Sequence, residues 1–173
     1  HKTDDQLAAI AAEVTVLTAA LRKLNVSVKF DDRTTQKPGF KFAEWELKGV
    51  PVRIAVGPKD LENGTFEVAR RDTLTKEVVS KDGIEIFISD LLAQIQKELF
   101  EKALNYRNTH ITEVNNFEEF KEVLDIKGGF VSAHWDGTAA TEERIKDLTK
   151  ATIRCIPLDR VEEVGGCVFT GES

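Results

Sequence analysis

The sequence contains no methionine, only two cysteines, and few of the larger aromatic residues, with one tyrosine and two tryptophans. Cys155 and Cys167 are too few for the disulfide framework of a small secreted protein, and they suit a reducing compartment. No apolar run approaches the roughly 20 residues that span a bilayer, and the N-terminus lacks the layout of a signal peptide. We therefore expect a cytoplasmic globular protein and, because methionine is absent, a piece of a longer chain.

The motifs of common enzyme classes are missing as well. Neither a G-x-S-x-G elbow, a P-loop nor a dinucleotide fingerprint occurs. The glycine-containing pairs at 63–64 and 128–129 read as turns, and His110 has no nucleophile in its sequence context. A small metal-dependent hydrolase thus has almost no residue support. We predict that this chain contains no catalytic residue and no cofactor-binding residue.

Acidic residues outnumber basic ones, and the net charge of -6 taken alone argues against a nucleic-acid binder. The charge is unevenly distributed, however. Between Arg33 and Lys76 nine basic side chains face six acidic ones, so this segment carries +3. Because salt confines the reach of a charged patch to about 8–10 Å, an acidic protein can still hold a local site for a polyanion.

Apolar periodicity predicts alternating helices and strands in two parts of the chain, which is an α/β architecture. We expect domains at 1–107 and 108–173, separated near the polar stretch 107–109. The first should hold a mixed central sheet flanked by helices, and the second should be a small α/β domain. The expected helices are 7–24, 41–48, 88–103, 117–124 and 141–148, and the expected strands are 26–30, 52–56, 66–68, 78–79, 130–135 and 152–156.

Four charged residues of the first part should meet at one edge of its sheet. Arg53 lies between Val52 and Ile54 and should therefore point away from the core. A short helix, a Gly-Pro turn and a hairpin across 73–75 should bring Glu46, Asp60 and Lys76 near it. Two carboxylates and two cations suit guanine, because a carboxylate can accept from N1–H and N2–H₂ while Arg or Lys donates to O6 and N7.

Two other interpretations stay open on spacing alone. The four charges could form ordinary surface ion pairs, each worth ~0–1 kcal/mol, which is the commonest explanation of a charge cluster. Alternatively, the chain could be a protein–protein interaction module that uses the acidic surface of residues 84–173. That second interpretation predicts binding that is insensitive to substitution of Arg53 or Asp60.

A resemblance favours base reading. The run Pro-Gly-x-Lys-Phe-x-x-Trp-Glu-Leu-Lys-Gly-Val-Pro-x-Arg at 38–53, followed by Gly-Pro-Lys-Asp at 57–60, resembles the anticodon-binding domain of prolyl-tRNA synthetases. Residues 128–131, 134–135 and 154–157 resemble the C-terminal appendix of the eukaryote/archaeal-type enzyme. The resemblance covers nearly the whole chain and implies that these residues read the two guanines of the proline anticodon: Glu46, Arg53, Asp60 and Lys76. It makes Arg33 and Lys41 candidate contacts to the RNA backbone, although the run 31–33 can also serve loop architecture.

The resemblance also implies the larger assembly. The parent enzyme would be a proline–tRNA ligase that uses ATP and Mg²⁺ at a catalytic core outside this chain. The implied partners are tRNA(Pro), the catalytic domain of the same enzyme and a second copy in a homodimer. Neither DNA nor a membrane is expected.

Zinc is a further implication of the resemblance, because the family's appendix often binds a structural zinc through four cysteines. The matching positions here are Asp136, Thr141, Cys167 and Thr170, of which only one is a thiol. Threonine is a poor ligand for a closed tetrahedral site, so we predict that zinc is absent. A substitute site formed by His134, Asp136 and Cys167 is the open alternative. Cys155 should be a buried thiol, and the appendix should be held by apolar packing of these residues: Phe130, Trp135, Ile145, Leu148, Ile153 and Ile156.

Overall fold

The computed structural model describes residues 3–161 and 164–172. Its contacts divide the chain into two compact units, one up to Glu101 and one from Lys102 onward. The division falls inside a single long helix, α4 (Ile84–Thr109). The expected helix here ended near residue 103, but the polar residues 107–109 continue the helix instead of interrupting it.

The first unit is built around a small sheet of three strands. Its elements before α4 are α1 (Asp4–Lys23), α2 (Pro38–Leu47), β1 (Val52–Ala55), α3 (Pro58–Asn63), β2 (Thr65–Arg70) and β3 (Lys76–Ser80). Strand β2 lies in the centre and pairs antiparallel with β1 on one side and with β3 on the other. The expected hairpin between β2 and β3 is confirmed.

One face of this sheet carries the core. Phe66 and Val68 of β2 are each only 1% exposed and pack with Leu17 and Leu21 of α1. Helix α4 adds a stripe at helical spacing to the same cluster: Ile84, Ile88, Leu91 and Ile95. Since successive residues of a strand point to opposite faces, the residues between these buried ones lie on the other face.

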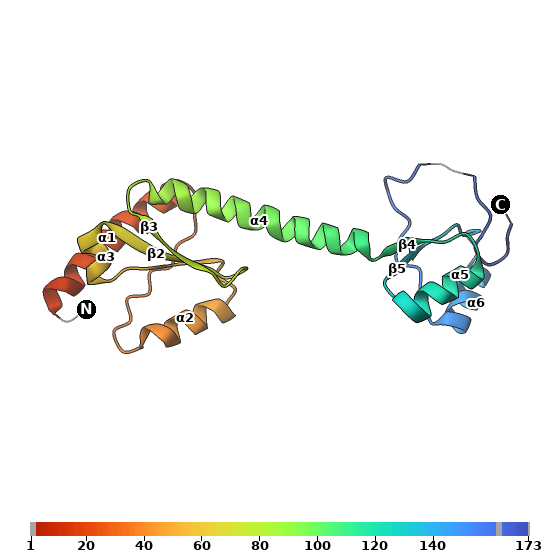
Figure 1. Ribbon diagram of the computed structural model, residues 1–173, viewed down its shortest axis with the longest axis horizontal. Coiled ribbons are helices and arrows are strands. Elements are labelled where there is room, and N and C mark those ends of the chain that lie inside the picture. Colours follow the sequence, from red (N-terminus) through yellow and green to blue (C-terminus); the bar gives the residue numbers. More distant parts are fainter. Residues whose placement is uncertain (1–2, 162–163, 173) are drawn as a thin grey trace. The chain divides into compact units, whose positions relative to one another are not determined.

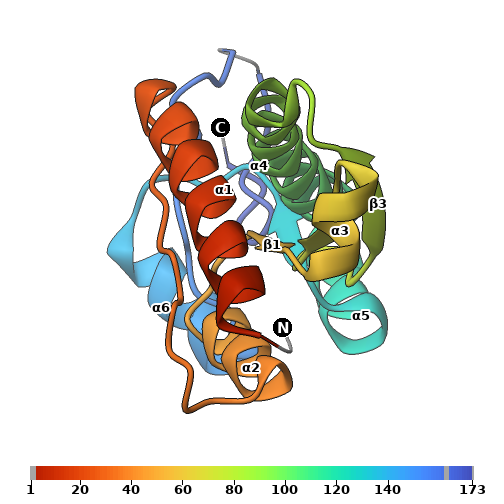
Figure 2. The same ribbon diagram turned by 90° about the vertical axis from the view of Figure 1, so that its left-hand side faces the viewer.

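The other face of the sheet is the one that α2 covers, on the opposite side from α4 (Figure 1). Helix α3 contacts β2 and also touches α1 (Figure 2). Helix α2 starts at Pro38, where the fixed φ of proline suits the first helical turn, and Gly49 follows its end with a φ of +83°. The sheet face that α2 covers carries two of the expected site residues, Arg53 of β1 and Lys76 of β3.

Three expectations for the first unit were wrong. Residues 26–30 form no strand: Val26 and Val28 pack on the core, but the Val28 carbonyl accepts from the Arg22 side chain instead of a neighbouring strand. The alternation of apolar and polar residues at 26–30 therefore reflects which side chains are buried, and no second strand among the described residues pairs with this segment. Residues 58–63 form α3, where only a Gly-Pro turn was expected. Among the described strands of this unit the pairing is antiparallel, so the sheet is not mixed.

The second unit contains a minimal parallel pair of strands. Its elements are β4 (Ile111–Glu113), α5 (Phe117–Glu122), the π-helical turn η1 (Val123–Lys127), β5 (Phe130–Ser132) and α6 (Ala139–Thr149). Strands β4 and β5 pair in parallel, as expected when a helix connects them. Asn116 caps α5 by accepting from the Glu119 amide at 3.0 Å.

The core of the second unit differs from the expected one. Val114, Phe120 and Val168 are its buried residues, and Ile145 packs against them. Four of the residues expected to replace the zinc are instead exposed: Phe130, Leu148, Ile153 and Ile156. The expected strand over 152–156 does not form, because its apolar side chains have no sheet face to bury against. Cys155 is exposed, contrary to expectation.

The expected α/β class is confirmed, with small sheets flanked by helices in both units. Within the described ranges, no helix combines the length and the apolar character needed to cross a bilayer.

Candidate nucleic-acid interface

Arg53 lies on the sheet face opposite the core, as predicted from its neighbours in β1. Its guanidinium carbon lies 3.6 Å from the centroid of the Phe42 ring, so the group stacks on α2. Its Nη1 donates to Oε1 of Glu67 at 3.2 Å. The Nε atom is buried and has no hydrogen-bond partner among the described residues. The guanidinium is thus held on two sides, and Nη2 is a further donor for which no hydrogen bond to a described residue is seen.

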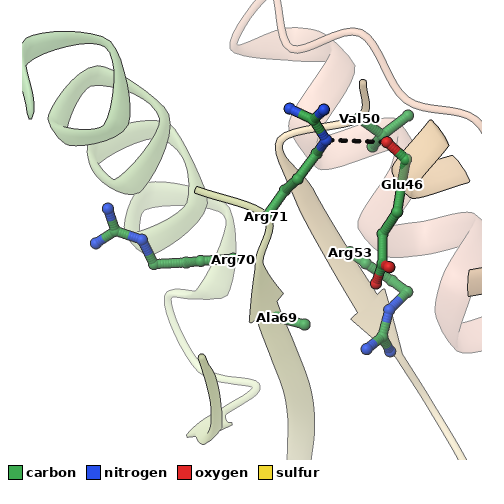
Figure 3. A pocket seen from close by; sticks show the side chains of 6 residues that line it. All are labelled: Glu46, Val50, Arg53, Ala69, Arg70 and Arg71. Carbon is green, nitrogen blue, oxygen red and sulfur yellow. Dashed lines mark hydrogen bonds between the residues drawn. The ribbon is translucent and has the colours of Figure 1, made fainter. Parts of the chain in front are cut away.

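Glu46 lies beside Arg53 at the end of α2. Both line a small recess together with Val50 and Ala69, and their side chains extend in the same direction in Figure 3. Arg71 fixes this end of α2, because its Nε donates to the Glu46 carbonyl oxygen at 2.9 Å. The recess offers only about 20 Å³, which is room for about one water molecule. A nucleobase could lie across its mouth but not inside it.

Lys76 reaches the same sheet face from the opposite edge. It is paired with Ala69 of β2, and Ala69 is paired with Arg53 of β1, so the three residues form one row across the sheet. The Nζ of Lys76 lies 3.8 Å from Oε2 of Glu67. Glu67 therefore contacts both cations, one with each carboxylate oxygen.

Asp60 does not line this recess. It is the third residue of α3, and its Oδ2 accepts from the backbone amide of Gly57 at 2.7 Å, which stabilises the start of that helix. Gly57 is four residues beyond Arg53, about 13 Å at the usual rise of a strand. The structure thus brings Glu46, Arg53 and Lys76 to one sheet face and places Asp60 at the far end of β1. One oxygen of its carboxylate remains for a second contact.

The two candidate backbone contacts, Arg33 and Lys41, are held by Asp31. Arg33 donates to both oxygens of Asp31, at 2.9 and 2.6 Å, and to Oε2 of Glu44 at 2.7 Å. Lys41 donates to the backbone carbonyl of Asp31 at 3.1 Å. The Trp45 indole donates to Oδ2 of the Asp31 carboxylate at 2.9 Å. These contacts favour loop architecture as the role of this run, because they tie residues 31–33 to α2.

Glu67, Phe42 and Arg71 were missed by sequence reasoning. Glu67 was counted only as one of the acidic residues that reduce the local charge, and its contacts depend on strand register. Phe42 lies one turn before Glu46 on α2, a spacing that could have indicated a shared helix face. Arg71 follows directly on the end of β2, where a side chain can reach back to the neighbouring helix.

The four positions that match the family's zinc ligands do come together in the second unit. The Thr141 hydroxyl donates to Oδ2 of Asp136 at 2.6 Å, and Thr141 and Cys167 are 6% and 3% exposed. Hydrogen bonds from the Thr141 hydroxyl and the Thr138 amide lower the pKa of Asp136, burial opposes them, and the side chains of Thr138 and Cys167 lower it further. Burial raises the pKa of the Cys167 thiol, but donors including the Thr170 hydroxyl and amide lower it overall.

This donor set does not fit zinc. Two of its four positions are hydroxyls, and the hydroxyl and carboxylate oxygens are already hydrogen-bonded to one another or to the sulfur. The part of the chain that the structure describes contains no group of three histidine, cysteine or acidic residues arranged to hold a metal ion. That includes the substitute set of His134, Asp136 and Cys167.

Comparison with protein families agrees with this geometry. Residues 3–99 match the family described as anticodon binding domain, and residues 117–173 match the family described as prolyl-tRNA synthetase, C-terminal. The chain belongs to the anticodon-binding domain family. Its second part is the C-terminal domain that accompanies it in prolyl-tRNA synthetases, so the resemblance read from the sequence is confirmed.

Curated relatives match this chain along almost its whole length. The proline–tRNA ligase of Flavobacterium johnsoniae is 81% identical over 172 residues, which is 99% of this chain and 35% of that protein. The proline–tRNA ligases of Flavobacterium psychrophilum and Porphyromonas gingivalis are 72% and 56% identical over the same shares. The chain thus spans about a third of the length of these relatives.

Proposed function

We propose that this chain is the anticodon-reading part of a proline–tRNA ligase and that its first unit recognises the guanines of the tRNA(Pro) anticodon. The observation that carries the proposal is the row across the sheet, where Glu46 and Arg53 line one recess and Lys76 lies at the other edge. The whole enzyme would use ATP and Mg²⁺ to activate proline at a catalytic core outside this chain. We further propose a cytoplasmic homodimer.

Guanine reading follows from the donors and acceptors of the recess. The Glu46 carboxylate can accept from the N1–H and N2–H₂ groups of one guanine, while the free donors of Arg53 reach its O6 or N7. The recess is too small to enclose a base, so recognition would be by edge contacts over its mouth. Asp60 lies too far along β1 to serve the same base. It would read the second guanine with the carboxylate oxygen that does not cap α3.

Substitutions of Arg53 test the first contact. Arg53→Lys keeps the charge but not the fork of donors, and Arg53→Ala removes both. We expect each to weaken binding of a proline anticodon stem-loop by ~1–3 kcal/mol, about 5- to 150-fold. Lys59→Ala, which removes an exposed positive charge from the same segment, should cause only a small and equal loss on any stem-loop.

Asp60 requires a substitution that preserves its structural role. Asp60→Asn can still accept from the Gly57 amide through its single side-chain oxygen, but its NH₂ group opposes the donors of guanine. We expect Asp60→Asn to weaken binding of the guanine stem-loop within the same range and to lower thermal stability less than Asp60→Ala does, because only the charge at the helix start is lost. Asp60→Ala should lower both.

Gel-shift titrations of all variants against two RNAs decide the proposal. The second RNA is the same stem-loop with both guanines replaced by adenine. Losses confined to the guanine RNA support base reading. Equal losses on both RNAs would reduce Arg53 and Asp60 to phosphate contacts and refute it, and binding unaffected by either residue would favour the interaction-module interpretation.

A further inference from the structure

Among the residues that the structure describes, Glu67 is the one that joins the two cations of the proposed base-reading face. It lies on β2, between Arg53 on β1 and Lys76 on β3, and its two oxygens lie 3.2 Å from Arg53 Nη1 and 3.8 Å from Lys76 Nζ. Both contacts are diagonal, because the residue directly opposite each cation is Ala69. Because the side chain of Ala69 is small, Glu67 can reach past it to both Arg53 and Lys76.

The contacts of Arg53 make Glu67 more than a neutralising charge. The guanidinium stacks on Phe42 through its face and is bonded to Glu67 through Nη1. A planar group fixed by one face and one edge has a defined orientation, and its remaining donors therefore point in a defined direction. The side chain of Arg53 is 16% exposed, so few water molecules compete with these contacts.

We infer that Glu67 is a positioning residue that sets the guanine specificity of this face, an inference that rests on the proposed function. It holds the donor fork of Arg53 in the orientation that a guanine edge requires. By balancing the charge of Arg53 and Lys76, it also lowers the attraction of the face for phosphate, which every RNA offers equally. Discrimination thus gains from both effects, because the correct contact is strengthened and the unspecific one is weakened.

Glu67→Gln removes the charge at nearly constant shape. Arg53 and Lys76 are then free to bind phosphate, so the stem-loop with adenines should bind about 3-fold more tightly than it binds the unaltered protein. The guanine stem-loop should bind about 3-fold more weakly, and the ratio between the two RNAs should fall about 10-fold. The dependence of log K on log salt should steepen by about 0.7 for each additional phosphate contact to a single strand.

Glu77→Gln is the matched control. Glu77 belongs to the neighbouring strand, and its replacement by glutamine changes the net charge by the same amount. It is paired with Val68 and thus lies on the opposite face of the sheet. Long-range electrostatics would affect the two variants alike. A difference between the two variants therefore requires that Glu67 act through its contacts with Arg53 and Lys76.

An RNA-free measurement tests the positioning role directly. In ¹⁵N-labelled protein, the Nε–H signal of Arg53 should exchange slowly with water, because the group is buried and held by Phe42 and Glu67. In Glu67→Gln this exchange should accelerate at least several-fold, and in Glu77→Gln it should not change. The same samples then serve for the titrations with the two stem-loops.

The outcomes separate the inference from the function on which it rests. If the unaltered protein discriminates between the RNAs but Glu67→Gln behaves like Glu77→Gln in either measurement, the inference about Glu67 is overturned and the proposed function stands. If the unaltered protein binds both RNAs equally, both are overturned. A reduced ratio together with faster exchange of the Arg53 signal supports the inference.

Discussion

Asparagine in place of Asp31 should loosen the loop that ties α2 to the first unit. Arg33 donates to both oxygens of Asp31, Trp45 donates to its Oδ2, and Lys41 Nζ lies 3.5 Å from its Oδ1. Asparagine offers one acceptor oxygen and turns an NH₂ group toward these donors. The Arg33 guanidinium would lose one of its two hydrogen bonds to this side chain. Trp45 and Lys41 would no longer face a negative charge.

The expected loss is about 2 kcal/mol of the free energy of unfolding at pH 7. Hydrogen bonds to a charged group contribute about 1.5–3 kcal/mol each, and leaving one without its partner costs about as much. The Asp31 side chain is only 13% exposed, so water replaces few of the lost contacts. We take about 2 rather than the full sum because Arg33 keeps its ion pair with Glu44.

The effect should depend on pH. Hydrogen bonds from the Arg33 side chain lower the pKa of Asp31 most strongly; burial raises it, and the Trp45 indole, the Arg33 amide and Lys41 lower it further, so the net shift is well below the ordinary value. A carboxyl with a lowered pKa contributes stability above its unfolded value of about 3.9, and that stability is lost as the pH falls further. The difference between the unaltered protein and Asp31→Asn should therefore be constant between pH 5 and 7 and should shrink below pH 4.

Urea unfolding followed by Trp45 fluorescence measures this unit alone when Trp135 is replaced by phenylalanine in every sample. Asp32→Asn is the matched control, because Asp32 is the adjacent exposed aspartate. Equal destabilisation by both substitutions would refute the role assigned to Asp31. So would a difference that does not shrink in acid.

Two predictions concern the second unit. Gly129→Ala should destabilise it by more than Gly137→Ala: both glycines have a positive φ, which costs about 1–2 kcal/mol for other residues, but only at Gly129 would the new Cβ meet a backbone oxygen, at 2.6 Å. Urea unfolding followed by Trp135 fluorescence compares the two, and equal losses would contradict the close contact. Metal analysis of the purified protein should find no stoichiometric zinc, and a chelator should leave unfolding unchanged. The triple change Asp136→Cys, Thr141→Cys and Thr170→Cys should create a site for one Zn²⁺ or Co²⁺, and one equivalent of zinc in the unaltered protein would overturn this prediction.

Local patterns in the sequence predicted local structure well. Alternation around Arg53 gave both β1 and the face on which Arg53 lies, since successive strand residues point to opposite sides. The cap of Asn116 was readable because its side chain serves an amide only three residues away. The capping role of Asp60 was also available, because proline at the first helical position and an acidic residue at the third are typical of a helix start.

Contacts that depend on strand register could not be derived from periodicity alone, and Lys76 was placed correctly only because a hairpin was assumed. Lys76 shares a face with Arg53 only because the turn over residues 71–75 has its particular length, and a shift by one residue would move Lys76 to the other face. The contacts of Glu67 with Arg53 and Lys76 depend on two registers, that of β1 with β2 and that of β2 with β3. The strand predicted at residues 26–30 was wrong for a related reason. Alternation shows which side chains are buried but not whether a second strand is available for pairing.

Under the proposed function, the paired charges of the first unit explain how an acidic chain would bind an RNA. Its net charge is -6, and three of the four arginines in the segment that carries the positive excess face carboxylates: Arg33 with Asp31, Arg53 with Glu67, and Arg70 with Asp72. Cations balanced in this way release few counterions when RNA binds, so they contribute little attraction that is independent of sequence. Under the proposed function, this unit would therefore supply discrimination between anticodons, and most of the affinity for tRNA would come from the rest of the enzyme. The corresponding expectation is a shallow salt dependence for the isolated stem-loop.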